Sequence, residues 1–265
     1  MKGTIAVFKK ETATYFQTPI AYVVIAVFTF IMGYFFTNLV SVFQKISVAY
    51  LRMQRAEFME QINITDMIAR PLLINMSVIM IFMIPLLTMR LFAEERKHGT
   101  YELLMTAPVT SLDIILGKYL AALFVVFIML GVTLFYSVTL HVFAVGDTGT
   151  GQGLAWATVL ASYLGAFLVG ASITAIGVFM SSVTQNQIVA AVLTFTVALM
   201  LYLLNWAAQS AEGTTQTVLS YISILDHAAN FSKGLIEVKS LVYYLTFIFF
   251  GLFLTYRSLE MDRHG

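Results

Sequence analysis

The chain has 265 residues, of which 59% are hydrophobic and 11% are charged, and its formal net charge is +1. This apolar content exceeds what a soluble core could bury, so it predicts an all-α, polytopic membrane protein. The small net charge argues against a nucleic-acid partner, and the absence of cysteine excludes disulfides, thiol catalysis and thiolate metal sites.

The N-terminal segment 4–17 is predicted to form a helix that lies in the membrane interface. Its apolar positions fall near one helical face: Ile5, Phe8, Thr12, Tyr15 and Phe16. Lys9, Lys10 and Glu11 fall on another face. A helix with one apolar and one charged face is typical of a segment at the boundary between lipid and water.

Six apolar segments are long enough to cross a bilayer, since about 20 helical residues span its hydrocarbon core. They lie at about 19–42, 71–90, 112–141, 155–181, 187–207 and 240–257. Apolar residues at helical spacing continue past the first segment, so its helix is expected to extend into water as a stalk before the chain turns back near 63–70. Lys118, near the start of the third segment, is expected to extend its amine to the lipid headgroups.

Small residues recur at helical spacing in the fourth segment: Ala157, Ala161, Gly165, Gly170, Thr174, Gly177 and Ser181. Small side chains let membrane helices approach each other closely. This pattern therefore predicts helix packing. Pro85, inside the second segment, is expected to kink that helix.

Segment 212–239 is too short and too often interrupted by polar residues to cross the membrane, so we expect short interfacial or re-entrant helices on the far side. Six spans place both termini on one side, and most lysine and arginine residues then fall on that side. Because positive residues favour the cytoplasmic side, both termini are predicted to be cytoplasmic.

The spans lack the chemistry of an ion-driven pump, because no Asp, Glu, Lys or Arg lies near the middle of any of them. The chain also lacks a phosphate-binding loop and the common hydrolase motifs, so it is not expected to be an enzyme by itself. His141 and His227 have no second ligand at metal spacing, so each is expected to be a capped or solvated histidine and not a metal ligand. Any energy that the protein uses is therefore expected to come from outside this chain.

The loop at 90–109 is rich in charge, with apolar residues interleaved and Gly99 available for backbone angles closed to other residues. Such charges can simply keep a connector in water, but apolar side chains in a wet loop favour a binding partner. The loop contains Glu94-Glu95-Arg96-Lys97-x-Gly99-Thr100-x-Glu102-x-Leu104 and then Thr106-x-Pro108-Val109. Two further stretches are Ser181-Ser182-x-Thr184-x-Asn186-Gln187 and His227-x-x-Asn230-Phe231-x-x-Gly234.

With the N-terminal helix and the six spans, these three stretches resemble the ABC-2 type transporter permeases. The resemblance is closest to the subfamily of the gliding-motility permease and the permease for nitrous-oxide-reductase maturation. It implies a permease subunit that forms the substrate pathway, works in export, and couples the pathway to ATP hydrolysis by a separate ATPase subunit.

The resemblance also implies site residues. The coupling helix that docks on the ATPase would involve Phe92, Glu94, Glu95, Arg96, Lys97, Gly99, Thr100, Tyr101, Glu102 and Leu104. A second cytoplasmic contact would involve Thr184, Gln185, Asn186 and Gln187. The far-side re-entrant segment, near the exit of the pathway, would hold His227, Asn230, Phe231 and Gly234.

In this interpretation the three glutamates of the loop pair with basic groups of the ATPase, while Phe92, Tyr101 and Leu104 fill a groove on it. No cofactor is expected on this chain, and ATP and Mg²⁺ would be bound by the partner subunit. Further expected partners are a second copy of the chain or a related permease, and the lipid bilayer of a bacterial or archaeal cytoplasmic (inner) membrane.

A different function would use the same loop. A membrane scaffold that recruits a cytoplasmic ATPase or an assembly complex, without transport, is the alternative. A passive channel is disfavoured, because no span shows a polar or charged face for a water-filled pore.

Overall fold

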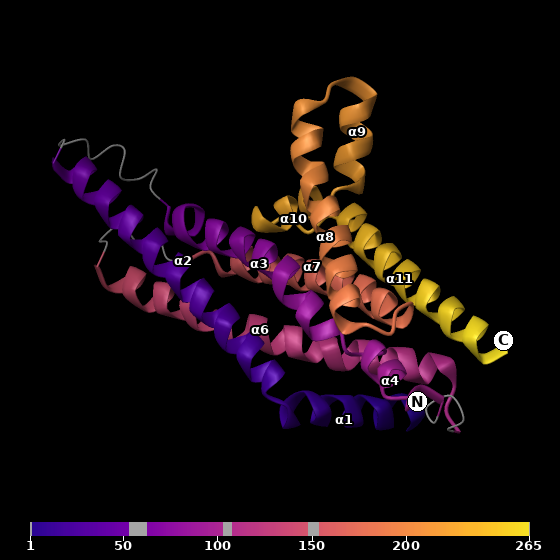
Figure 1. Ribbon diagram of the computed structural model, residues 1–265. Coiled ribbons are helices and arrows are strands. Elements are labelled where there is room, and N and C mark those ends of the chain that lie inside the picture. The colour runs from indigo at the N-terminus through magenta and orange to yellow at the C-terminus, as the bar shows by residue number, and fades with distance from the viewer. Residues whose placement is uncertain (1, 53–62, 103–107, 148–153, 265) are drawn as a thin grey trace.

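The computed structural model describes residues 2–52, 63–102, 108–147 and 154–264 (Figure 1), and these residues contain helices and no strand. Six helices are long and apolar enough to cross a membrane. The prediction of an all-α, polytopic membrane protein is therefore confirmed. The long helices are α2 (Pro19–Arg52), α3 (Arg70–Thr88), α6 (Ser111–Asp147), α7 (Trp156–Ser182), α8 (Gln187–Ser210) and α11 (Val238–His264).

Shorter helices complete the described part of the chain. These are α1 (Lys2–Gln17), the π-helix η2 (Thr65–Ala69), α4 (Ala93–Lys97), α9 (Gly213–Ile222) and α10 (Ile224–Ser232). Helix α2 continues to Arg52, as expected for the first part of the stalk. The rest of the predicted stalk, 53–62, lies outside the described residues.

Helix α7 is the centre of the bundle. It contacts α3, α6, α8, α10 and α11, and 83% of its most apolar window is buried. A Cβ at Gly165 would lie 2.6 Å from Cβ of Phe231, and one at Gly177 would lie 2.1 Å from Oγ1 of Thr88. These neighbours can approach only because the glycines carry no side chain. The predicted packing role of the small residues is confirmed at both glycines.

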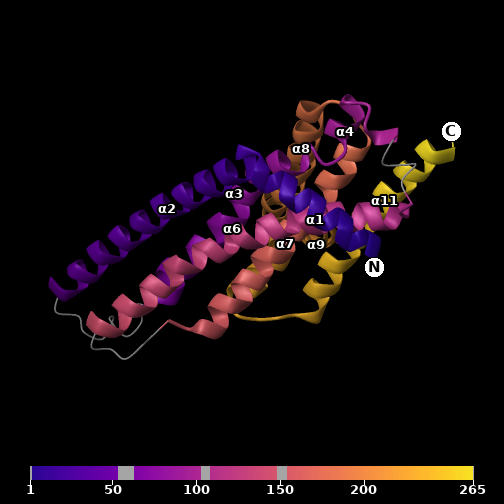
Figure 2. The same cartoon turned by 90° about the horizontal axis from the view of Figure 1, so that it is seen from below.

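Helices α1 and α4 lie together at one end of the bundle, and both chain termini lie at this end (Figures 1 and 2). Helix α1 packs along the first part of α6, and Val7, Glu11 and Tyr15 form its buried face. The hairpin of α8 and α9 rises at the opposite end (Figure 1). The site described next is built at the α1 and α4 end.

Candidate functional site

Helix α4 is a single short turn that its own sequence stabilises. Glu94 and Glu95 lie in its first turn and Arg96 and Lys97 in its last, so both pairs of charges oppose the helix dipole. Gly99 has a φ of +69°, and its backbone N–H donates to the carbonyl of Arg96 at 3.3 Å. A left-handed residue at this place is the usual way to end a helix.

Ser181, at the end of α7, anchors the start of α4. Its hydroxyl oxygen accepts hydrogen bonds from the backbone N–H groups of Phe92 at 3.0 Å and Ala93 at 3.1 Å, and its O–H donates to the carbonyl of Met89 at 3.0 Å. The first N–H groups of a helix have no partner within the helix, so the buried hydroxyl satisfies two of them. This anchoring could not be predicted from the sequence, in which Ser181 stands out only as a small residue of the fourth span and as the first residue of one of the three resembling stretches.

Phe92 is not a docking residue. Its side chain is 0% exposed and belongs to the main hydrophobic core, and the amine of Lys118 lies 5.1 Å from the centre of its ring. The expectation that Phe92 fills a groove on a partner is therefore wrong. The ring is used within the chain because it packs the start of α4 onto the bundle.

Lys118 forms the centre of a buried ion-pair network. Its Nζ lies 2.9 Å from Oε1 of Glu11 on α1 and 3.0 Å from Oε2 of Glu95 on α4, and it donates to the carbonyl of Leu91 at 2.6 Å. The side chain is 1% exposed. The expectation that Lys118 reaches the headgroups is wrong, because α1 and α4 cover it and supply the negative charges that a buried cation needs.

Lys10 completes this network from the exposed side. Its Nζ lies 3.3 Å from Oε1 of Glu95 and 3.7 Å from Oε1 of Glu11. Partial burial would lower the pKa of Lys10, but the carboxylates of Glu95 and Glu11 outweigh this effect and raise that pKa. Two lysines thus share two glutamates, and α1, α4 and α6 are joined at one point.

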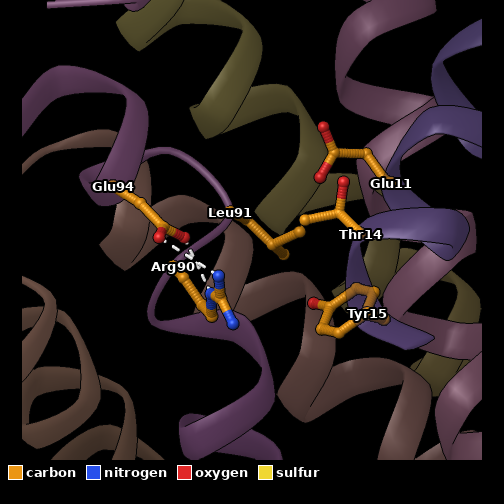
Figure 3. A pocket seen from close by; sticks show the side chains of 6 residues that line it. All are labelled: Glu11, Thr14, Tyr15, Arg90, Leu91 and Glu94. Carbon is orange, nitrogen blue, oxygen red and sulfur yellow. Dashed lines mark hydrogen bonds and ion pairs between the residues drawn. The ribbon is translucent and has the colours of Figure 1, made fainter. Parts of the chain in front are cut away.

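Glu94 is also paired within the chain. Arg90 donates to its two carboxylate oxygens at 2.7 and 3.1 Å, and to the hydroxyl of Thr18 at 3.2 Å. Figure 3 shows this pair facing Glu11, Thr14 and Tyr15 of α1 across a cavity of about 20 Å³, which is large enough for a single water molecule. Glu94 and Glu95 are thus both paired with cations of this chain, and the expectation that they pair with basic groups of a partner stays a prediction.

Arg96 and Tyr101 join the loop to the end of α11. Arg96 forms an ion pair with Asp262, and the hydroxyl of Tyr101 donates to the same carboxylate at 2.9 Å. The guanidinium of Arg96 lies 4.5 Å from the centre of the Tyr101 ring. Burial and the hydrogen bond to Asp262 both raise the pKa of Tyr101, so its hydroxyl stays protonated. Both side chains therefore hold the loop against the bundle.

The remaining predicted residues of the loop lie on the surface. Lys97, Gly99, Thr100 and Glu102 are exposed, as is His98, while Leu104 lies outside the described residues. Helix α4 contacts α8, which brings the turn before α8 beside the loop. In that turn Gln185 and Asn186 are exposed, whereas Thr184 and Gln187 are half-buried. Two apolar neighbours are exposed as well, Val183 at 54% and Ile188 at 72%.

We call this combined area the α4 surface. It consists of Lys97, His98, Gly99, Thr100, Glu102, Val183, Gln185, Asn186 and Ile188. Asn186 also caps α8, because its side-chain oxygen accepts a hydrogen bond from the backbone N–H of Ile188 at 2.9 Å. The structure thus brings the two predicted cytoplasmic contacts together, but with exposed residues that only partly match the predicted set.

The predicted far-side residues form a packed cluster. His227 is 5% exposed, lies within 3.2 Å of the hydroxyl of Ser240 and 3.1 Å of the carbonyl of Tyr221, and stacks on Tyr243 with ring centres 4.1 Å apart. Phe231 is 0% exposed and fills the space beside Gly165. These contacts give both side chains structural roles.

Asn230 and Gly234 shape the chain that leaves α10. The side-chain amide of Asn230 donates to Glu237 at 2.9 Å, and Gly234 has a φ of +80° with Thr158 close by. A side chain at Gly234 would be strained by this backbone conformation. Within the described residues, no group of three or more His, Cys, Asp or Glu side chains could hold a metal ion.

Two comparisons bear on the identity of the chain. The curated proteins contain no match to it. The family model described as ABC-2 family transporter protein matches residues 5–256, which is nearly the whole chain. The match covers α1 from Ile5 onward, the α4 surface, the long helices α2, α3, α6, α7 and α8, and α11 as far as Tyr256. This multi-pass membrane protein therefore belongs to the ABC-2 transporter family.

Proposed function

We propose that the chain is the permease subunit of an exporter, and that the α4 surface docks on a separate ATP-binding-cassette ATPase. Membership of the ABC-2 family supports the membrane-subunit role. In this proposal the ATPase binds ATP and Mg²⁺, and the permease binds no cofactor. The subfamily of the gliding-motility and nitrous-oxide-reductase-maturation permeases remains the proposed placement within the family.

The observation that carries the proposal is that the α4 surface is exposed on its outer side and fixed on its inner side. Ser181 ties α4 to α7, Glu95 ties it to α1 and α6, and Arg96 ties it to α11. A short loop held in this way cannot move independently of the spans. A force applied to the α4 surface would therefore reach the helices that form the pathway, as an energy-coupling contact requires.

The chemistry of the contact differs from the sequence-based expectation. Val183 and Ile188 are the apolar groups available to fill a groove, while Lys97 and His98 add exposed basic groups and Glu102 adds an exposed acidic one. An apolar centre with a polar rim is the usual anatomy of a protein interface. We infer that a partner surface with apolar pockets and some acidic character fits the α4 surface better than a purely basic one.

The proposed setting follows from this contact. The ATPase is cytoplasmic, so α1, α4 and both termini face the cytoplasm of a bacterium or archaeon, and α9 and α10 lie on the far side. A second copy of the chain or a related permease completes the pathway. The exposed apolar residues of α2 and α8, among them Phe30 at 80% and Met200 at 64%, are available to a second permease as well as to lipid.

The proposal is tested by reconstituting the chain with the ATPase encoded in a neighbouring reading frame. We expect the permease to raise ATP hydrolysis in liposomes, and Lys97→Glu with Ile188→Asp to abolish both binding and stimulation. Lys233→Glu, at an exposed lysine of the α10 end, is the matched control and should change neither. Binding without any stimulation, under all candidate substrates, would instead favour a recruiting scaffold.

A further inference from the structure

An apolar groove opens on the outside of the bundle, between the N-terminal helix and two spans. It has a volume of about 370 Å³, and its lining includes Ile5 and Phe8 of α1, Leu123, Phe124 and Phe127 of α6, and Phe167 of α7. The volume lies within the range of about 300–1,000 Å³ that is usual for small-molecule sites. Thr4 is the single polar side chain of the lining.

Aromatic rings build the walls of this groove. Phe8 meets Phe124 edge to face with ring centres 6.0 Å apart, and Phe127 meets Phe167 in the same way at 6.3 Å. Such pairs hold each other in place, so the hollow is a feature of the packing. From Leu120 to Phe127 the groove follows α6 for about 10 Å, at 1.5 Å per residue.

The α1 end of the groove carries positive charge. Lys2 and Lys9 are both exposed, and they lie three residues before and four residues after Ile5, so the three side chains form one stripe on α1. The expectation that Ile5 and Lys9 fall on different faces of this helix is therefore wrong. Helix α1 lies at the end of the bundle (Figures 1 and 2). Phe127 and Phe167 lie well inside α6 (Ser111–Asp147) and α7 (Trp156–Ser182). Cations at the membrane surface and an apolar hollow below them match the two parts of an anionic phospholipid.

The charge at this end is only partly balanced within the chain. Asp113 of α6 accepts a hydrogen bond from the backbone N–H of Thr4 at 3.0 Å and one from the hydroxyl of Thr110 at 2.8 Å. Its carboxylate is thus used to fix α1 on α6. Lys10 and Glu11, on the other side of α1, belong to the Lys118 network.

We propose that this groove binds one acyl chain of an anionic phospholipid, with the phosphate near Lys2 and Lys9. A helix of a second copy is about 10–12 Å across with its side chains, which is broad for a hollow of about 370 Å³ that runs for about 10 Å along α6. The bound lipid holds α1 against α6 and α7. This proposal does not depend on the ATPase contact.

The test uses the purified full-length chain in detergent, with dioleoyl phosphatidylglycerol and dioleoyl phosphatidylcholine as the probes. Native mass spectrometry counts the lipids retained by each chain, and the midpoint of thermal unfolding measures stabilisation. We expect each chain to retain one phosphatidylglycerol in preference to phosphatidylcholine. Each of the two lysines should raise the ratio of retained phosphatidylglycerol to retained phosphatidylcholine about fivefold. Equal retention of the two lipids by the wild-type chain would overturn the proposal.

Two sets of variants separate the groove from its charged rim. Leu123→Trp fills the groove and should abolish retention of both lipids. Phe135→Trp is the control, because Phe135 is an exposed residue of the same helix outside the groove, and this variant should retain the lipids as the wild type does. Lys2→Gln with Lys9→Gln changes only exposed side chains, so the fold is kept, and should remove the preference for phosphatidylglycerol. Unchanged lipid preference in that double variant would overturn the headgroup assignment. A dimer that Leu123→Trp disrupts would place a second copy in the groove and overturn the proposal as a whole.

Discussion

Lys118 and Glu95 form an ion pair between a membrane-spanning helix and the exposed loop, with 3.0 Å between Nζ and Oε2. The lysine is 1% exposed and is also paired with Glu11 of α1. A cation buried this deeply is stable only while its carboxylates remain in place. The pairing therefore makes the position of α4 depend on α1 and α6.

Removing Lys118 should strongly destabilise the protein. Lys118→Met leaves Glu11 and Glu95 facing each other with only Lys10 to balance them, and breaking a buried pair in this way costs about 3–5 kcal/mol. Thermal unfolding of the purified protein measures the effect, with Lys97→Met as the exposed control. Adding Glu11→Gln and Glu95→Gln should restore part of the lost stability. A Lys118→Met protein as stable as the control would mean that the network does not form.

Ser181→Ala should loosen the start of α4 without unfolding the bundle. The variant leaves the backbone N–H groups of Phe92 and Ala93 without their acceptor, which costs about 1–3 kcal/mol. Hydrogen exchange at these two amides should become faster. Ser182→Ala is the matched control, because the hydroxyl of Ser182 bonds only to the carbonyl of Phe179 in its own helix. Similar exchange in the two variants would contradict the anchoring role.

Gly177→Ala should separate α7 from α3. The added Cβ would lie 2.1 Å from Oγ1 and 2.6 Å from Cβ of Thr88, and overpacking of this kind costs about 1–3 kcal/mol. Gly131→Ala on α6 is the control, because no heavy atom lies within 4 Å of the added Cβ there. Alanine also favours a helix over glycine, so the control should unfold at the same or a higher temperature. Equal midpoints for the two variants would disprove close packing at Gly177.

Acid should weaken the far-side cluster through His227. Burial lowers its pKa below the ordinary value of 6.5; Lys239 lowers it further, whereas the Tyr221 carbonyl, Asp226 and Glu237 act in the opposite direction. The unfolded chain then binds more protons than the folded chain at pH values just under 6.5. This stabilisation is complete above pH 6.5 and is lost as the pH falls from there through the lowered pKa of His227 in the folded chain. His227→Gln should therefore lose less stability than the wild type between pH 7.5 and 5.5, and an equal loss would exclude His227 as the cause.

The fold was largely predictable from the sequence, because hydropathy and helix length decide which segments can cross a bilayer. The small residues of α7 indicated close packing before any neighbour was known. These features depend on local sequence alone.

The partners of the charged residues were not predictable in the same way. Glu11 and Lys118 are separated by 107 positions, and Arg96 and Asp262 by 166, so only tertiary packing brings them together. Helical spacing placed Glu11 with Lys9 and Lys10 on a charged face of α1, but only the two lysines are exposed, whereas Glu11 is 8% exposed and pairs with Lys118 of α6. Phe92 was assigned to a partner because its neighbours are charged, although its ring turns into the core. The sequence of a loop does not indicate which of its side chains pack against the rest of the chain and which stay exposed.

The most direct test is photo-cross-linking from a reagent attached to a single introduced cysteine. The chain contains no cysteine, so each variant needs only one substitution. His98→Cys lies on the α4 surface, and Tyr221→Cys replaces a side chain that is 54% exposed on α9 at the opposite end. Each variant carries a short photoactivatable group and is assembled with the ATPase in membrane vesicles. The account predicts a cross-link to the ATPase from position 98 and none from position 221. A cross-link from position 221 with none from position 98 would contradict it.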